Sequence, residues 1–183
     1  MSKSEALAIL SEIQAATFQN AAQLPLKESA QPEWQGIGYQ IGGIRLVSPM
    51  GEVNEILKVP KITPLPGVKS WISGIANVRG RLMPIVDLHE YLSMTPTLPM
   101  VQWRVLIVED EDLVAGLVVE QSLGIQHFLE GSYEEASGEG LETIRPYVKG
   151  AFRHGGRVFF EMDLKSILRD ERFFDVAEKS GPR

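Results

Sequence analysis

Two segments of the chain repeat one another at a fixed offset without a gap, the first from Trp71 to Leu92 and the second from Tyr147 to Leu168. In each copy, the order of glycines, apolar residues and an Asp-Leu pair predicts a short strand, a glycine-centred turn, a second strand and a brief helix. Identical residues fall on Gly74/Gly150, Gly80/Gly156, Arg81/Arg157, Asp87/Asp163, Leu88/Leu164 and Leu92/Leu168. This duplication predicts two similar small β-units related by a pseudo-twofold axis.

The composition limits the kinds of function that such a chain can have. With 183 residues, 44% of them apolar, the chain can bury one core or two small cores packed together. The net charge of −6 argues against a nucleic-acid partner. Cysteine is absent, which excludes disulfides, thiolate metal sites and cysteine nucleophiles. No apolar run reaches the roughly 18 residues of a spanning helix, so we expect a soluble, unsecreted protein with no direct membrane insertion.

Composition and apolar periodicity divide the chain into an N-terminal arm, a β-rich region and a C-terminal tail. Residues 1–35 predict an amphipathic helix over 4–24 and a polar tether, and a chain that begins near Gln35 is expected to fold without them. Strand patterns follow from 36, with a hairpin turn at Gly42-Gly43 and a proline-rich crossing segment before Trp71. A Pro/Thr joint divides the first β-subdomain (36–95) from the second (101–170). The acidic stretch 130–143 is predicted to be a mobile surface loop, and 171–183 a C-terminal tail.

Residues that could support catalysis or metal binding are few and poorly spaced. Asp87 and His89 could in principle share a metal ion. The sequence favours a simpler arrangement, in which Asp87 caps a short helix and His89 lies exposed on it, because Asp163 occupies the equivalent position without a histidine. The acidic cluster 109–112 resembles the magnesium site of receiver domains, but too little chain follows it, so we expect a solvated hairpin turn. The sequence therefore predicts no enzyme, no cofactor and no metal.

The turn of the first repeat differs from that of the second in a way that suggests a function. The first copy places Asn77 and Arg79 where the second has Arg153 and Gly155, so the shared frame requires neither an amide nor a guanidinium there. Such divergence favours a binding role. An equally good alternative is that Asn77 bonds nearby backbone groups and that Arg79 pairs with a neighbouring carboxylate.

The same segment resembles the CheW family of chemotaxis adaptors. The resemblance rests on a V-x-E-I strand at 53–56, followed by a proline-rich crossing and by a pattern that runs from Gly74 through Asn-x-Arg-Gly to Asp87-Leu88. It covers 36–168 and is strongest with the PilI-type members, which serve the pathway that controls type IV pili and twitching motility. The family implies a mainly β fold of two five-stranded SH3-like β-barrel subdomains related by a pseudo-twofold.

The resemblance also implies partners and a binding surface. Family members are cytoplasmic scaffolds that couple the tip of a methyl-accepting chemoreceptor to the regulatory domain of a CheA-type histidine kinase, and they gather at the inner face of the membrane through the receptor. The residues that correspond to the family's receptor-binding surface are Val53, Glu55, Ile56, Gly74, Asn77 and Arg79; kinase contacts cannot be matched. The alternative, a nucleic-acid or small-ligand binding β-barrel module, would require a basic stripe with exposed aromatic residues.

Overall fold

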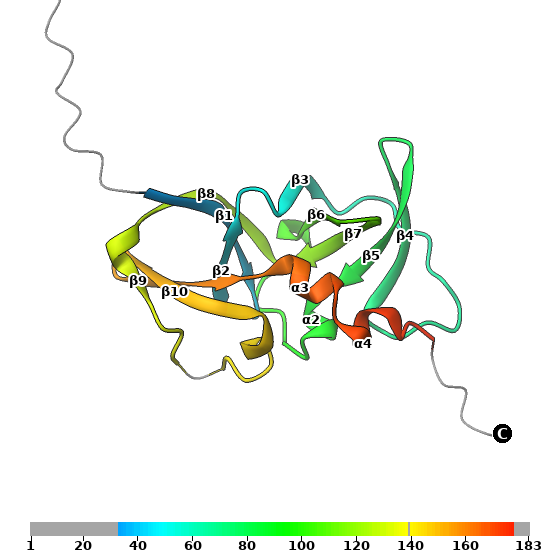
Figure 1. Ribbon diagram of the computed structural model, residues 1–183. Helices are drawn as coiled ribbons and strands as arrows, with labels where there is room; N and C mark the ends of the chain where they lie inside the picture. The colour runs from blue at the N-terminus through cyan, green and yellow to red at the C-terminus, as the bar shows by residue number, and fades with distance from the viewer. Residues whose placement is uncertain (1–32, 139, 178–183) are drawn as a thin grey trace, which may run out of the picture. The chain divides into compact units, whose positions relative to one another are not determined.

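The computed structural model describes residues 33–138 and 140–177, so the expected N-terminal helix lies outside the described residues. The described chain is mainly β, with short helices at the ends of strands (Figure 1). The strands are β1 (Glu33–Ile41), β2 (Ile44–Pro49), β3 (Val53–Lys58), β4 (Ile72–Val78), β5 (Arg81–Asp87), β6 (Arg104–Asp110), β7 (Leu113–Val119), β8 (Gln121–Leu129), β9 (Tyr133–Glu134), β10 (Val148–His154) and β11 (Arg157–Met162). The helices are α2 (Leu88–Tyr91), α3 (Leu164–Leu168) and α4 (Glu171–Phe174), with 3-10 turns η1 (Met100–Gln102), η2 (Glu130–Ser132) and η3 (Arg145–Tyr147).

The strands form two sheets that lie side by side, with α2 and α3 near their junction (Figure 1). One sheet has six strands in the order β8-β1-β2-β11-β10-β9, and the other has five in the order β3-β6-β7-β5-β4. Two parallel pairings, β5 with β7 and β11 with β2, join strands from the two halves of the sequence. Each sheet therefore contains strands from both 36–95 and 101–170, and these two segments do not correspond to the two sheets.

The structure confirms the duplication in detail. The hairpins β4–β5 and β10–β11 have the same antiparallel pairing, and each has a register shift at the equivalent place, before Gly74 and before Gly150. The strand ends are held by equivalent bonds, since the amide of Asp87 donates to Trp71 O at 2.8 Å and the amide of Asp163 donates to Tyr147 O at 2.9 Å. The two halves of the chain exchange hairpins. The hairpin β1–β2 belongs to the sheet that contains the second repeat, and the hairpin β6–β7 belongs to the sheet that contains the first repeat.

Each sheet curves around a small apolar core of its own, and a larger core lies between the sheets. The cores are Ala76, Val78, Met83, Ile85, Val105, Ile107, Val114 and Val118 in the five-stranded sheet, and Val47, Phe128, Phe152 and Phe159 in the six-stranded sheet. Among the described residues no ladder joins β3 to β4 or β8 to β9. The expectation of two similar β-units was correct, whereas closed five-stranded barrels were wrong, because the sheets stay open and β9 adds a sixth strand to one of them.

The acidic stretch, which was expected to be a mobile loop, and the beginning of the C-terminal tail both pack against the β-structure. The acidic stretch 130–143 contributes β9, which pairs with β10, and buries Ala136 and Leu141. At the start of the tail, Glu171–Phe174 form α4, whose Phe173 is buried against the rings of Trp71 and Tyr91. Apolar side chains spaced among acidic ones are therefore enough to anchor both segments.

Candidate functional site

The six residues predicted to bind a receptor all lie on the five-stranded sheet. Val53, Glu55 and Ile56 belong to β3, Gly74 and Asn77 to β4, and Arg79 to the turn between β4 and β5. β3 and β4 are the two outer strands of this sheet, but its curvature brings them together. Arg79 Nη2 lies 2.6 Å from Glu55 Oε1, so an ion pair connects the two edges of the sheet.

Arg79 has an unusual backbone for a residue with a side chain. Its φ is +52°, in the left-handed region, and the following Gly80 has a φ of +84°. The equivalent turn of the second repeat uses Gly155-Gly156, with φ values of +57° and +73°. Left-handed backbone costs about 1–2 kcal/mol for an L-residue other than glycine. The first repeat therefore accepts a conformational cost in order to place a guanidinium at this turn.

Asn77 and Gly74 have structural roles beside Arg79. Asn77 Oδ1 accepts a hydrogen bond from the Gly80 amide at 2.8 Å and so closes the turn, as the alternative interpretation of the sequence proposed. Gly74, with a φ of +138°, lies against the backbone of Thr63 in the crossing segment, where a methyl group would not fit. Gly74 is thus buried beneath the surface, whereas Asn77 is exposed and its side chain is used by the turn.

Val53 and Ile56, which the family resemblance assigns to the binding surface, expose only part of their side chains. Both are half-buried and pack against the core between the two sheets. The side chain of Glu55 is 26% exposed and that of Arg79 is 78% exposed. The charged pair and the exposed Asn77 are therefore the accessible part of the predicted group.

Three further residues, which the sequence analysis did not assign to the binding surface, extend it. Leu82 is 71% exposed and lies directly across the hairpin from Asn77. Arg81 Nη1 lies 3.3 Å from Glu109 Oε1 on β6, which makes a second ion pair at the same end of the sheet. We call Glu55, Arg79, Arg81, Leu82 and Glu109 the hairpin-tip surface. The sequence gave no signal that Arg81 and Glu109, 28 positions apart, would pair. Leu82 gave no signal either, because its repeat partner, Val158, is also apolar.

His89 is buried, whereas the sequence analysis expected it to be exposed. Asp87 does cap α2, since its Oδ1 accepts from the His89 amide at 2.9 Å. The ring of His89, however, turns inward, with 1% of the residue exposed, and stacks on Trp103 at a centroid distance of 4.9 Å. The expectation failed because Trp103 and Glu120, which surround the ring, lie in segments that the sequence did not place near α2.

The acidic cluster 109–112 lies at the hairpin between β6 and β7, as predicted, with Glu111 and Asp112 in the turn and Glu109 and Asp110 at the end of β6, but it is not fully solvated. Asp110 is buried and accepts two hydrogen bonds from Arg169, at 2.6 and 2.8 Å. The Arg169 hydrogen bond lowers the pKa of this carboxyl group. In the part of the chain that the structure describes, no three His, Asp or Glu side chains are placed to hold one metal ion.

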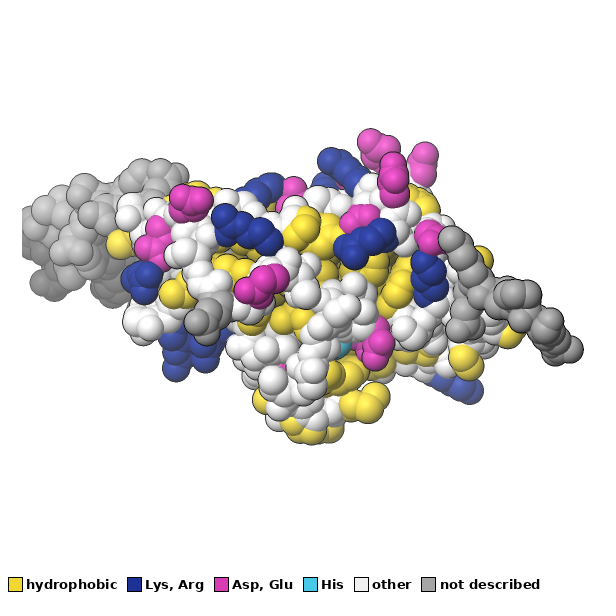
Figure 2. All heavy atoms as spheres, turned by 90° about the horizontal axis from the view of Figure 1, so that it is seen from below, with side chains coloured by type: hydrophobic (Ala, Val, Ile, Leu, Met, Phe, Trp, Pro, Cys, Tyr) yellow, Lys and Arg dark blue, Asp and Glu magenta, His cyan; other side chains and the backbone are white. Residues whose placement is uncertain are grey.

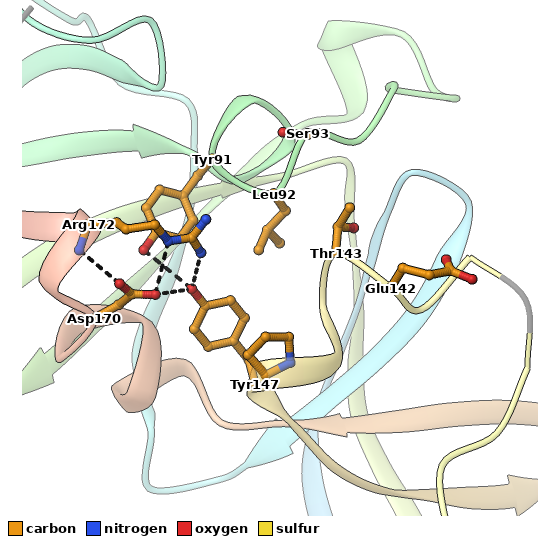
Figure 3. Close-up of a pocket in the computed structure, with 9 residues that line it drawn as sticks. Tyr91, Leu92, Ser93, Glu142, Thr143, Tyr147, Asp170 and Arg172 are labelled. Carbon is orange, nitrogen blue, oxygen red and sulfur yellow. Dashed lines mark hydrogen bonds and ion pairs between the residues drawn. The ribbon is translucent and has the colours of Figure 1, made fainter.

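An open pocket of about 370 Å³ lies where α2, η3 and α4 meet (Figure 3). The Tyr147 hydroxyl donates to Asp170 and accepts from Arg172, whose guanidinium lies 5.1 Å from the centre of the Tyr91 ring. Burial raises the pKa of Tyr147. Burial would also raise the pKa of Asp170, but hydrogen bonds from Tyr147 and Arg172 outweigh it and lower that pKa. Tyr147, Asp170 and Arg172 thus bond to one another and fasten α4 to the β-structure.

Comparison with known proteins identifies the family to which this arrangement belongs. The model of the CheW-like domain matches residues 35–172. Protein PilI of Pseudomonas aeruginosa is 41% identical over 157 residues, which cover 86% of this chain and 88% of that protein. The chain belongs to the CheW-like domain family.

More distant members of the CheW family agree with the fold. The chemotaxis protein CheW of Thermotoga maritima is 21% identical over 77% of this chain and 91% of that protein. The crystal structure of the scaffolding protein TtCheW from Thermoanaerobacter tengcongensis superposes with a TM-score of 0.63 at 22% identity, over 73% of this chain and 90% of that one. As a CheW-like protein, the chain is an adaptor of a chemosensory pathway and not an enzyme. None of the described helices has both the length and the apolar content to cross a bilayer.

Proposed function

We propose that this CheW-like protein couples the cytoplasmic tip of a methyl-accepting chemoreceptor to the regulatory domain of a CheA-type histidine kinase. The similarity to PilI over most of both chains supports a place in the pathway that controls type IV pili and twitching motility. The protein acts in the cytoplasm, near the inner face of the membrane, where the receptor tip holds it. The receptor binds the hairpin-tip surface around the Glu55–Arg79 pair.

The observation that carries this proposal is the left-handed backbone of Arg79. An exposed ion pair such as Arg79–Glu55 contributes about 0.2–1 kcal/mol to stability. The left-handed conformation costs about 1–2 kcal/mol, which glycine would avoid, as Gly155 does in the second repeat. Stability alone therefore does not explain Arg79. A guanidinium that forms charge-assisted bonds to a partner does explain it.

Charge reversal at Arg79 tests the proposal, and the chain offers a matched control. Arg153 belongs to the equivalent hairpin of the second repeat, and its Nη2 lies 2.6 Å from Glu134 Oε1, the same distance as in the Arg79–Glu55 pair. Arg79→Glu should weaken binding of a receptor-tip fragment by about 2 kcal/mol or more, while it changes the free energy of unfolding by less than about 1 kcal/mol. Arg153→Glu should leave receptor binding unchanged. Glu55→Lys should behave like Arg79→Glu.

Isothermal titration calorimetry and thermal melting of each variant measure the two effects separately. If Arg79→Glu melts early and binds in proportion to its folded fraction, the residue is structural. If Arg153→Glu weakens binding as much, the receptor does not select the hairpin-tip surface.

The alternative of a nucleic-acid binding module finds less support in the surface. Figure 2 shows positive and negative side chains interspersed over one face of the protein, with no continuous basic stripe on that face. Arg79, Arg81 and Arg153 are each paired with a carboxylate. A surface of paired charges suits recognition of another protein better than recognition of a phosphate backbone.

A further inference from the structure

The turn η1, which precedes β6, presents two apolar side chains to solvent. Met100 is 72% exposed and Val101 is 84% exposed, the highest values among the large apolar side chains of residues 33–138 and 140–177. Val59, which follows β3 at the same end of the five-stranded sheet, is also exposed. Exposed apolar side chains that gather at one end of a sheet indicate a place where a partner binds.

The turn is held by bonds of its own, so the exposure of these side chains does not come from a frayed segment. The guanidinium of Arg104 donates to the carbonyl oxygens of Gln102, at 2.9 Å, and of Trp103, at 2.7 Å. Trp103 donates from Nε1 to Leu98 O at 3.0 Å, and its amide donates to Met100 O at 3.0 Å. A turn fixed in this way loses little conformational entropy when a partner binds.

Two cations lie opposite one another beside this turn. Lys58 and Arg104 are direct partners in the ladder between β3 and β6, and like charges in this position destabilise a sheet. None of the ion pairs that join described side chains includes Lys58, Arg104 or the exposed Lys61. This end of the sheet is therefore positive, in a chain whose net charge is −6, and carboxylates from a partner would relieve the repulsion. We call Lys58, Val59, Met100, Val101 and Arg104 the η1 surface.

The η1 surface lies away from the hairpin-tip surface. Arg104 begins β6, whereas Glu109, of the hairpin-tip surface, lies near its end. At about 3.3 Å per residue, about 17 Å of strand separates the two. Glu55, the member of the hairpin-tip surface nearest along β3, is three positions before Lys58, so their side chains point to opposite faces of the sheet. The two surfaces therefore leave room for two partners at once, as bridging requires.

We propose that the η1 surface binds the regulatory domain of the kinase, at an apolar depression of that domain flanked by Asp or Glu side chains. The inference rests on the proposed function, which gives this protein a second partner, and it assigns that partner a surface of its own. Met100 and Val101 enter the depression, and Lys58 and Arg104 meet the carboxylates at its edge. An apolar centre with a polar rim is the common arrangement of a protein interface.

Calorimetric titration with the purified regulatory domain of the cognate kinase tests this assignment, and titration with a receptor-tip fragment is the parallel measurement. Val101→Asp should weaken kinase binding by about tenfold or more and should leave receptor binding unchanged. Leu82→Asp, at a similarly exposed apolar side chain of the hairpin-tip surface, should do the reverse. Ile125→Asp, on β8 and outside both surfaces, should change neither.

Lys58→Glu separates binding from stability. The change removes the repulsion between Lys58 and Arg104, so the variant should melt at or above the temperature of the wild type. Its kinase binding should nevertheless be weaker by about tenfold, whereas Lys58→Arg should bind like the wild type. Added salt should weaken kinase binding of the wild type more than that of Lys58→Glu.

Several results would overturn the assignment. Wild-type kinase affinity in both Val101→Asp and Lys58→Glu would do so and would leave the bridging function standing. Weaker receptor binding in these variants, with kinase affinity unchanged, would give the η1 surface to the receptor instead. Lys58→Glu that keeps its kinase affinity but no longer binds phosphatidylserine vesicles, which the wild type binds, would give the surface to a membrane. A wild type that does not bind the kinase domain at all would overturn the proposed function together with the inference.

Discussion

Replacing Gly74 by alanine should destabilise the protein much more than the same change at its repeat partner, Gly150. At Gly74, φ is +138°, a region that costs an L-residue about 1–3 kcal/mol. The added methyl group would also overlap the carbonyl of Thr63 and would lie 2.9 Å from Ile62 Cγ2. The backbone must then shift, which breaks the two hydrogen bonds between Thr63 and Ile75, of 2.8 and 2.9 Å, each worth about 1 kcal/mol. We expect a total loss of about 3–5 kcal/mol.

At Gly150 the obstacle is a side chain that can move. The methyl group would overlap the end of the Tyr133 ring, and Tyr133 is 45% exposed. If the ring swings outward, the protein loses the hydrogen bond from Tyr133 to Glu161, of 2.7 Å, and a ring contact with Phe152. We expect Gly150→Ala to cost about 1–2 kcal/mol.

Urea unfolding of the two variants and the wild type, monitored by tryptophan fluorescence, gives both values from one series. A Gly74→Ala variant that loses less than about 1 kcal/mol, or less than Gly150→Ala, would refute the claim that the crossing segment packs on Gly74. Gly74 would then be free to serve as a contact residue.

Two other predictions follow from buried groups. A chain that starts at residue 32 should unfold cooperatively. One that starts at Gln35 should be less stable by about 2–4 kcal/mol, because it lacks the Trp34 ring, whose centre lies 4.5 Å from that of Phe152. Equal midpoints of the two chains in urea would contradict this. Burial raises the pKa of Glu52, so its ionisation opposes folding as pH rises from the ordinary glutamate value through the raised one. Glu52→Gln should therefore gain stability relative to the wild type as pH is raised from about 4, near the ordinary glutamate pKa. A relative loss of stability in melting scans over rising pH would refute this.

The local structure could be predicted from the sequence because it depends on short-range signals. The Gly42-Gly43 turn, the two duplicated hairpins and the helix caps of Asp87 and Asp163 all appear where the pattern placed them. Each depends on residues close together in the chain, such as a glycine that permits a positive φ or a carboxylate that accepts from a nearby amide.

The exchange of hairpins between the repeats could not be predicted in the same way. Alternation of apolar residues in β5 and β7 indicates that both strands are buried, but it does not say which strand pairs with which. The burial of His89 depends on Trp103 and Glu120, which only the folded chain brings to α2. In the candidate site, the pairing of Arg79 with a carboxylate was anticipated, whereas Arg81, Leu82 and Glu109 emerged only from the curvature of the sheet.

Bridging of receptor and kinase is the central claim, and co-sedimentation tests it most directly. Receptor cytoplasmic fragments assembled on vesicles are spun down with the purified regulatory domain of the cognate kinase, with or without this protein. We predict that the kinase domain sediments only when the protein is present. We also predict that Arg79→Glu releases both from the receptor while it still binds the kinase domain in solution. If the kinase domain sediments equally well without the protein, or if Arg79→Glu bridges as well as the wild type, the account of this surface is wrong.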